Sequence, residues 1–390
     1  RVTVNNKFGF IDSSGKLVIN MIYDNAEDFH EGLAAISKGG QWNEDGEYIE
    51  GKWGFIDKTG KVIVPIIYDK VCDFNEGYAA VTKDNKLGFV NKSGDIVIPL
   101  SYGDPNHYDK FKFSEGIAIV VTGAIGDDEL VYKAIKTDGS VVFNLKYEYA
   151  KDFKEGMLAV ATGGYWGYGG GYYLACSYND GKWGFIDNAG REIVSPTYDY
   201  VGDFNEGIAF VAKDDKFGAI NKSGKVVVPI IYDDISNASQ GLILVKSNNK
   251  WGYVDYTGKV VIPLKYDEAC DFSEGLATAS NNGYWGAIDK KGNTIIPFKY
   301  NNLWNFHEGV VRVKAEKGGK WGFLDKKGNM VIDPVYQAAS DFVNGVAVVK
   351  KDNKFGVIKA PSISTPKTQH TGSIKANKQY INTSLSAPSS

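Results

Sequence analysis

A Trp-Gly pair recurs along this chain and constrains its fold more than any other feature. It stands at Trp53-Gly54, Trp183-Gly184, Trp251-Gly252, Trp285-Gly286 and Trp321-Gly322. In four further copies Phe or Leu replaces the Trp: Phe8-Gly9, Leu87-Gly88, Phe217-Gly218 and Phe355-Gly356. Trp251 and Trp285 are 34 residues apart (285 − 251). A unit of this length cannot bury its apolar face alone. The period therefore predicts a tandem repeat whose units stack on one another.

The unit from Lys250 to Ser280 shows the expected local structure. Residues 251–255 and 259–262 are rich in β-branched and aromatic side chains, which predicts two strands. Residues 276–279 begin a third strand, and a short turn leads from it to the next Trp-Gly strand. No segment has a helical pattern, so we expect an all-β chain of three-stranded antiparallel meanders.

Turn and breaker residues recur at fixed places in the unit. An Asp enters the turn between the first two strands and is expected to accept from backbone N–H groups, while the closing Gly takes a positive φ. This Asp is residue 255 in the specimen unit and recurs as Asp12, Asp57, Asp187, Asp289 and Asp325. Proline follows the second strand, as at Pro65 and Pro263, and its missing N–H predicts that the strand stops there.

The motif resembles that of a known family. Lys52-Trp53-Gly54-Phe55-Ile56-Asp57 is similar to the signature of the WG (KWG) β-repeat family of bacterial proteins, and the segments at 182–187 and 320–325 repeat it. The resemblance covers residues 1 to about 359. It implies a β-rich interaction scaffold, often secreted or at the cell surface. It implies no common enzymatic activity, so no catalytic residue is carried over.

About ten such units follow one another between residues 1 and 359. They are shorter than the usual four-stranded blade of a propeller, and so we expect an open curved or superhelical array. A closed propeller-like ring is the alternative. Residues 360–390 lack the motif and are rich in Ser, Thr, Pro and Lys, which predicts a flexible tail or linker.

Composition narrows the classes of partner. The net charge is −3 and the charges of both signs are interspersed, so the basic stripe of a nucleic-acid-binding protein is not expected. No apolar run approaches the length of a transmembrane helix, and so we expect no membrane insertion. Arg1 opens the chain, which suggests a missing upstream segment such as a signal peptide. Three cysteines without CxxC spacing predict neither a disulfide framework nor a zinc site, and we expect no metal and no cofactor.

Function is expected where the copies differ. Three insertions, after Gly32, Gly116 and Gly156, enter the same turn and should emerge on the same edge of the N-terminal half. The third insertion and the first carry aromatic residues among glycines and polar residues: Tyr165, Trp166, Tyr168, Tyr172 and Tyr173, with Trp42 and Tyr48. Aromatic rings in exposed loops suit recognition of a protein or a glycan. Alternatively, these rings cover a sheet edge.

We therefore predict a non-enzymatic scaffold that binds a protein or glycan ligand through these seven residues. The first alternative is a structural spacer or a surface subunit that associates with itself. A less expected alternative is a hydrolase that uses carboxylates of the second insertion, Asp127, Asp128 or Glu129.

Overall fold

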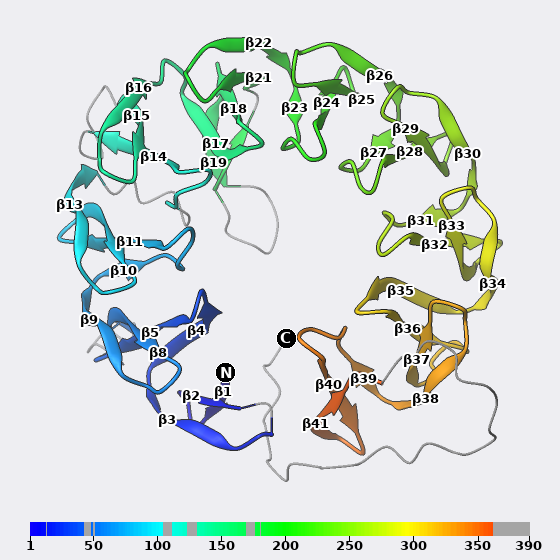
Figure 1. Ribbon diagram of the computed structural model, residues 1–390, viewed down its shortest axis with the longest axis horizontal. Helices are drawn as coiled ribbons and strands as arrows, with labels where there is room; N and C mark the ends of the chain where they lie inside the picture. The colour runs from blue at the N-terminus through cyan, green and yellow to red at the C-terminus, as the bar shows by residue number, and fades with distance from the viewer. Residues whose placement is uncertain are drawn as a thin grey trace. The chain divides into compact units, whose positions relative to one another are not determined.

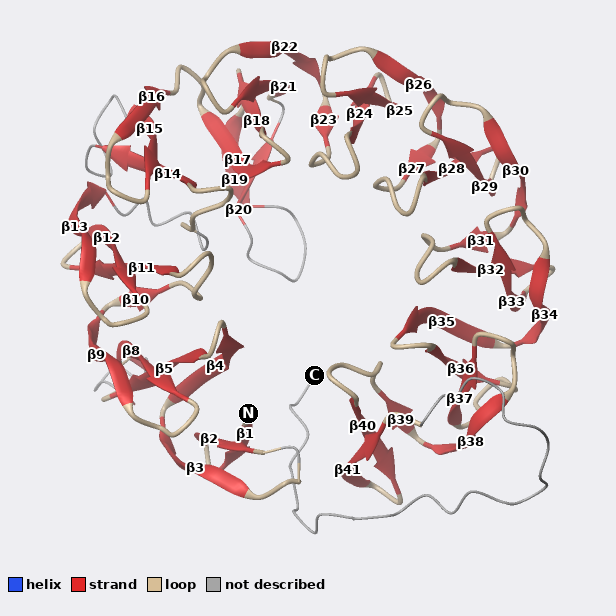
Figure 2. Ribbon diagram, in the orientation of Figure 1, coloured by secondary structure: helices blue, strands red, loops and turns tan. Residues whose placement is uncertain are grey.

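The computed structural model describes residues 1–12, 14–42, 48–49, 51–103, 111–122, 131–168, 176–179 and 181–361. The regular secondary structure in these ranges consists of β-strands alone, so the expected all-β tandem repeat is confirmed (Figure 2). No helix in the described ranges is long and apolar enough to cross a membrane. The chain divides into two compact parts, each made of several repeats. They are called unit 1 (Arg1–Phe204) and unit 2 (Asn205–Ser390) below.

The described residues of unit 1 form five sheets of the repeat and two short hairpins (Figure 1). The sheets have the orders β1-β2-β3, β4-β5-β8-β9, β10-β11-β12-β13, β14-β15-β16 and β17-β18-β21-β22, and the hairpins are β6-β7 and β19-β20. The strands of this unit are β1 (Val2–Val4), β2 (Lys7–Ile11), β3 (Leu17–Tyr23), β4 (Asn25–His30), β5 (Leu33–Lys38), β6 (Gln41–Trp42), β7 (Tyr48–Ile49), β8 (Lys52–Asp57), β9 (Val62–Tyr68), β10 (Lys70–Val71), β11 (Tyr78–Lys83), β12 (Lys86–Asn91), β13 (Ile96–Gly103), β14 (Ile117–Thr122), β15 (Val131–Lys136), β16 (Val141–Asn144), β17 (Tyr149–Lys154), β18 (Met157–Thr162), β19 (Tyr165–Tyr168), β20 (Cys176–Asn179), β21 (Lys182–Asp187), β22 (Glu192–Tyr198) and β23 (Tyr200–Val201).

Unit 2 repeats the same arrangement. Strands β24, β25 and β26 pair in that order, and the sheets β27-β28-β29-β30, β31-β32-β33-β34, β35-β36-β37-β38 and β39-β40-β41 follow. The strands of this unit are β24 (Ile208–Lys213), β25 (Lys216–Asn221), β26 (Val226–Tyr232), β27 (Asp234–Ile235), β28 (Leu242–Ser247), β29 (Lys250–Asp255), β30 (Val260–Tyr266), β31 (Glu268–Ala269), β32 (Leu276–Asn281), β33 (Tyr284–Asp289), β34 (Thr294–Tyr300), β35 (Asn302–His307), β36 (Val310–Lys314), β37 (Trp321–Asp325), β38 (Met330–Tyr336), β39 (Ala338–Ala339), β40 (Val346–Lys351) and β41 (Lys354–Lys359).

The prediction of three strands per sheet is wrong for most repeats, because a fourth strand joins them. In one example, β31 pairs with β32 through Glu268 opposite Ser280. This strand is only two residues long, too short for an alternating pattern to reveal it. Four antiparallel strands make up the blade of a propeller. The architecture of the repeat thus matches the propeller-like alternative rather than an array of three-stranded meanders.

The prediction that proline ends the second strand is also wrong. Strand β9 runs through Pro65 and β30 runs through Pro263. Both strands stand last in the order of their sheets, so one of their sides pairs with no strand of that sheet. A missing N–H costs no ladder bond on such an edge, and proline there hinders pairing with another chain.

The glycine of the Trp-Gly pair is required by the backbone of the neighbouring strand. Trp53 lies opposite Tyr68 and Phe55 lies opposite Val64, so a single residue, Gly54, faces a longer stretch of β9. A Cβ atom on Gly54 would lie 2.6 Å from the carbonyl oxygens of Val64 and Pro65. Only glycine therefore allows the two strands to approach this closely.

Successive sheets share their hydrophobic cores, as the repeat length predicted. In unit 1, Phe55 and Val64 of one sheet pack in the same buried cluster as Val81 of the next. The sequence Asp73-Phe74-Asn75-Glu76-Gly77 is one copy of an Asp-Phe-x-Glu-Gly motif that recurs along the chain. The ring of Phe74 lies with its centroid 4.8 Å from that of Phe55. Such aromatic pairs add about 0.5–1.5 kcal/mol beyond the burial of their area. Phe74 therefore joins the cores of two successive repeats.

The turn Asp acts as predicted. Asp255 Oδ1 accepts hydrogen bonds from the backbone N–H groups of Thr257 at 2.8 Å and Lys259 at 3.1 Å. Gly258 has a φ of 83°, the positive value expected at the end of this turn.

Candidate functional site

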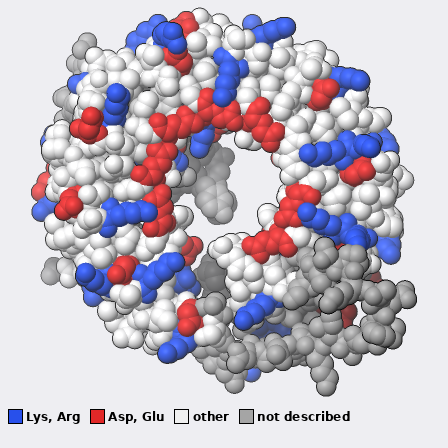
Figure 3. Space-filling view, in the orientation of Figure 1, with Lys and Arg blue, Asp and Glu red and all other residues white. Residues whose placement is uncertain are grey.

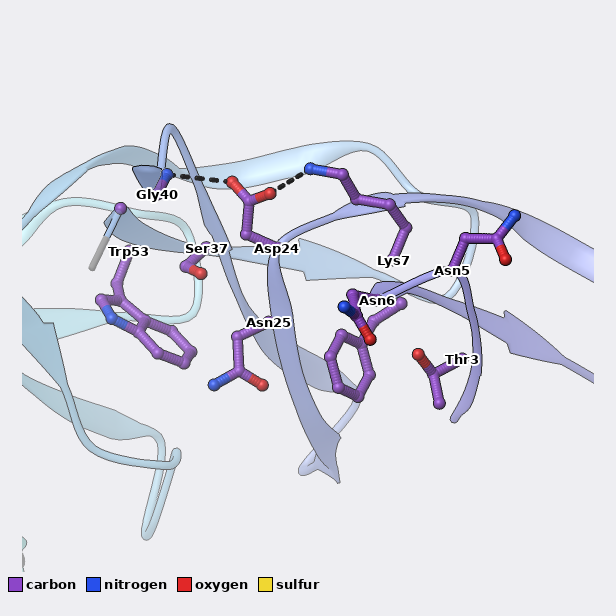
Figure 4. A pocket seen from close by; sticks show the side chains of 11 residues that line it. Thr3, Asn5, Asn6, Lys7, Asp24, Asn25, Ser37, Gly40 and Trp53 are labelled. Carbon is purple, nitrogen blue, oxygen red and sulfur yellow. Dashed lines mark hydrogen bonds and ion pairs between the residues drawn. The ribbon is translucent and has the colours of Figure 1, made fainter. Parts of the chain in front are cut away.

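A pocket of about 640 Å³ lies between the first two sheets of unit 1 (Figure 4). Its walls carry two aromatic residues and several amides and hydroxyls. The first sheet contributes Thr3, Asn5, Asn6, Lys7 and Phe8; the second sheet and its connections contribute Asp24, Asn25, Ser37, Gly40, Gly51 and Trp53. This volume falls within the range of about 300–1,000 Å³ that is usual for small-molecule sites.

Strand register brings the walls together. In the second sheet, Asn25 lies opposite Ser37, and Ser37 lies opposite Trp53, so the three form one row across β4, β5 and β8. In the first sheet, Thr3 lies opposite Phe8. Residues directly opposite in antiparallel strands project from the same face. Each wall is therefore a cross-strand row that faces the neighbouring sheet.

The turn at the rim of the pocket has a fixed conformation. Asn5 and Asn6 join β1 to β2 and have φ values of 50° and 59°. Two consecutive residues with positive φ form the type I′ turn of a tight hairpin, where Asn is favoured. The turn thereby fixes the positions from which these two amides extend.

The charged pair of the pocket belongs to the repeat and is not special to this site. Lys7 donates a hydrogen bond to Asp24, and the backbone N–H of Gly40 donates another at 3.1 Å. Burial opposes ionisation of Asp24, but these bonds outweigh it and hold the pKa of the carboxyl below its usual value. Lys250 and Asp267 form the same ion pair in unit 2.

The pocket lies at the root of the first insertion. Gly40 and Gly51 flank the hairpin of β6 and β7, in which Trp42 and Tyr48 are backbone partners. A Cβ atom on Gly51 would lie 2.2 Å from the carbonyl oxygen of Lys38, so only glycine allows the two ends of the insertion to approach this closely. Two of the predicted ligand-binding residues thus stand on the segment that leaves the pocket.

The third insertion forms a separate hairpin. Tyr165, Trp166 and Tyr168 stand on β19, and Trp166 lies opposite Tyr178 of β20. The hairpin β19-β20 connects β18 to β21, as β6-β7 connects β5 to β8, so the two insertions enter corresponding turns as predicted. No strand pairing joins the two hairpins within the described residues. Tyr172 and Tyr173 lie outside the described residues.

The side chains of the seven predicted residues lie outside the described part of the structure, so their place relative to the pocket is not described. The residues that do line the pocket were missed from the sequence. Asn25, Ser37 and Trp53 are far apart along the chain, and only register makes them a row. The available signals were the Asn5-Asn6 turn and the two glycines at the ends of the first insertion.

The carboxylates predicted for a hydrolase, Asp127, Asp128 and Glu129, lie outside the described residues. Within the described ranges, no group of three or more His, Cys, Asp or Glu side chains is placed to hold a metal ion. In the face drawn in Figure 3, Asp and Glu gather in rows along one edge of the sheets, and Lys and Arg lie beside them without a continuous basic stripe.

Comparison with known proteins identifies the repeat. The family described as WG containing repeat matches nine segments: 8–42, 53–86, 88–123, 134–166, 183–217, 217–251, 251–285, 285–321 and 321–355. No curated protein matches the chain.

Solved structures resemble the chain at low sequence identity. A computationally designed protein, Ika8, is 13% identical with a TM-score of 0.37, over 74% of this chain and 94% of that chain. A eukaryotic initiation factor is 11% identical with a TM-score of 0.44, over 80% and 93%. Hsv2 of Kluyvelomyces marxianus is 10% identical with a TM-score of 0.29, over 71% and 78%.

Proposed function

Because the chain belongs to the WG containing repeat family, we propose that its stacked sheets form a non-enzymatic scaffold that binds a protein or glycan ligand. The ligand enters the pocket between the first two sheets and is contacted further by the first insertion. The aromatic residues of the third insertion offer a second contact surface. Secretion or display on the bacterial surface remains part of this proposal, and fractionation of the source cells tests it.

One observation carries the proposal: Trp53 is half-buried beside a pocket at the root of an insertion. Large aromatic residues in partly enclosed sites supply contact area with little loss of side-chain entropy, and they dominate many recognition surfaces. The rest of the repeat forms core and turns, which hold this position rigidly.

The chain provides a matched control for Trp53. Trp285 begins the corresponding Trp-Gly pair in unit 2 and is also half-buried. It lies opposite Ser280, as Trp53 lies opposite Ser37, but it does not line the pocket. Replacing either Trp with Ala removes the same ring from the same place in a repeat, so the two variants should lose similar stability.

The test compares the wild-type chain with Trp53→Ala and Trp285→Ala, each immobilised and exposed to surface glycans and proteins of the source cells. We expect wild type and Trp285→Ala to retain a ligand that Trp53→Ala does not. Equal retention by all three chains would exclude the pocket as the binding site. A Tyr165→Ala/Trp166→Ala variant tests the third insertion; unfolding rather than lost retention would identify these rings as cover for a sheet edge.

The alternative of a self-associating subunit has one observation in its favour. The edge strands expose aliphatic side chains, including Ile67 (44%) on β9 and Ile231 (60%) on β26. Apolar side chains beside an unpaired edge favour association. Sedimentation equilibrium over a concentration range decides this alternative, since a strictly monomeric chain excludes it.

A further inference from the structure

The charge balance of the pocket limits the chemistry of its ligand. Lys7 and Asp24 are the charged residues in its lining, and they pair with each other. Asp24 also accepts the backbone N–H of Gly40. An anionic or cationic ligand would have to break this pair, which recurs in other repeats as part of the scaffold. The pocket therefore favours a neutral ligand.

The remaining polar groups are amides and hydroxyls. Asn5, Asn6 and Asn25 each carry both a donor and an acceptor, and Thr3 and Ser37 add hydroxyl groups. Asn25 Oδ1 accepts the backbone N–H of Ala26 at 2.9 Å, which fixes its amide and leaves Nδ2 as the donor for a ligand. A ligand with several hydroxyl groups matches this set, because a hydroxyl both donates and accepts.

Aromatic rings stand on both sides of these polar groups. Phe8 comes from the first sheet and Trp53 from the second, and Figure 4 shows Trp53 and Asn25 across from Thr3, Asn5 and Asn6. The C–H face of a sugar ring is apolar and stacks on an aromatic ring, while its hydroxyl groups point outward to hydrogen-bonding partners. An aromatic residue beside fixed amides offers both kinds of contact.

We infer that this pocket binds a short neutral oligosaccharide, with one sugar ring stacked on Trp53 and its hydroxyls bonded to Asn25 and Asn6. The inference rests on the proposed binding function and specifies the ligand class. A peptide ligand is the competing outcome.

The repeat itself supplies a variant that should fold. Glu268 occupies the place of Asn25 in the row Glu268–Ser280–Trp285, opposite a buried serine as in the pocket. Asn25→Glu therefore installs a side chain that the same sheet position already accepts elsewhere. It removes the Nδ2 donor and adds an unpaired negative charge to the pocket.

Isothermal titration of the full chain with cellotetraose, chitotetraose, maltotetraose and mannotetraose tests the inference. Tetragalacturonate and a neutral Ser/Asn tetrapeptide serve as comparison ligands. At least one neutral tetrasaccharide should bind. Its affinity should fall by about tenfold or more in Asn25→Glu and Trp53→Ala, as expected when one hydrogen bond or stacked ring is lost. The ligand affinity of Trp285→Ala and the melting temperature of Asn25→Glu should stay close to those of the wild type.

The outcomes separate the ligand class from the binding function. If the peptide or tetragalacturonate binds in a Trp53-dependent manner and no neutral tetrasaccharide does, the saccharide inference is wrong and the binding function stands. If no ligand binds, the saccharide inference is wrong, and ligand retention by the immobilised chain then decides the binding function. Saccharide binding that is unchanged in both Asn25→Glu and Trp53→Ala would overturn the assignment of this pocket.

Discussion

Glu76 accepts a hydrogen bond from the backbone N–H of Gly116 at 2.8 Å, across the boundary between two successive sheets. The same carboxylate accepts the N–H of Glu115 at 2.7 Å. Glu76 has a φ of 52°, a conformation that side chains other than glycine seldom adopt. A glutamate at this place thus clamps the corresponding turn of the next repeat elsewhere too: Glu31 accepts the N–H of Gly77, and in unit 2 Glu206 accepts those of Gln240 and Gly241.

Replacement of Glu76 tests this clamp. Glu76→Ala leaves two backbone N–H groups without their carboxylate acceptor. Because the Glu76 side chain is exposed, we expect the free energy of unfolding to fall by about 1 kcal/mol. Glu76→Gln should lose less stability, since Gln240 fills this role in unit 2 and accepts the backbone N–H of Gly275 at 2.9 Å. The measurements are the urea midpoint and the hydrogen exchange of the Gly116 amide. Unchanged exchange in Glu76→Ala would show that the clamp contributes nothing.

Acid should weaken the clamps. A hydrogen bond from Lys92 lowers the pKa of Glu31, and one from the Tyr256 hydroxyl lowers that of Glu206. Each folded pKa lies below the unfolded value of about 4.3, so the stabilisation is present above that pH and is lost as the pH falls through the folded pKa. Melting temperatures between pH 7 and pH 2.5 check this. A Glu31→Gln/Glu206→Gln variant should show a shallower decline below about pH 4; a decline as steep as that of the wild type contradicts it.

Gly54→Ala should destabilise the protein through a backbone clash. Its Cβ would press on the carbonyl oxygens of Val64 and Pro65, and relieving this overlap costs about 1–3 kcal/mol. Gly77→Ala is the control, because Gly77 has a φ of 85° and open space around it, so only backbone strain is introduced. Thermal unfolding of both variants measures the difference. If Gly54→Ala melts at the wild-type temperature, the strand crossing does not need glycine.

A natural exception supports the role of this glycine. In one repeat, Tyr132 and Lys133 stand where the others carry Trp-Gly or a similar pair. There Lys133 pairs directly with Asn144, and β16 ends at that residue after four residues. The corresponding strand β9 has seven. A side chain at this position therefore coincides with the loss of the longer edge strand.

The turn aspartate allows a prediction with an internal control. Asp255→Ala removes the acceptor of two backbone N–H groups and should lower the free energy of unfolding by about 1 kcal/mol. Asp255→Asn should be nearly neutral, because Asn221 accepts the N–H groups of Ser223 and Lys225 in the same way. Chemical denaturation of the two variants checks the ranking, and equal losses would show that the negative charge matters more than the oxygen.

Local chemistry explains what could be predicted from the sequence. The strands, the Asp-to-Gly turns and the positions of the insertions each depend on residues within a few places of one another. Their propensities and spacing therefore indicated them before any contact was known. The sequence shows that glycine recurs beside tryptophan, but it does not show the backbone around Pro65 against which Gly54 packs.

Tertiary structure decided what depends on neighbours across strands and sheets. Two-residue strands such as β31 form because a partner strand offers hydrogen bonds, and Pro65 remains in a strand because that strand lies at an edge. The sequence by itself determined the repeat and its period. Only register placed Asn25 beside Ser37 and Trp53, since a row across three strands joins residues that no local pattern connects.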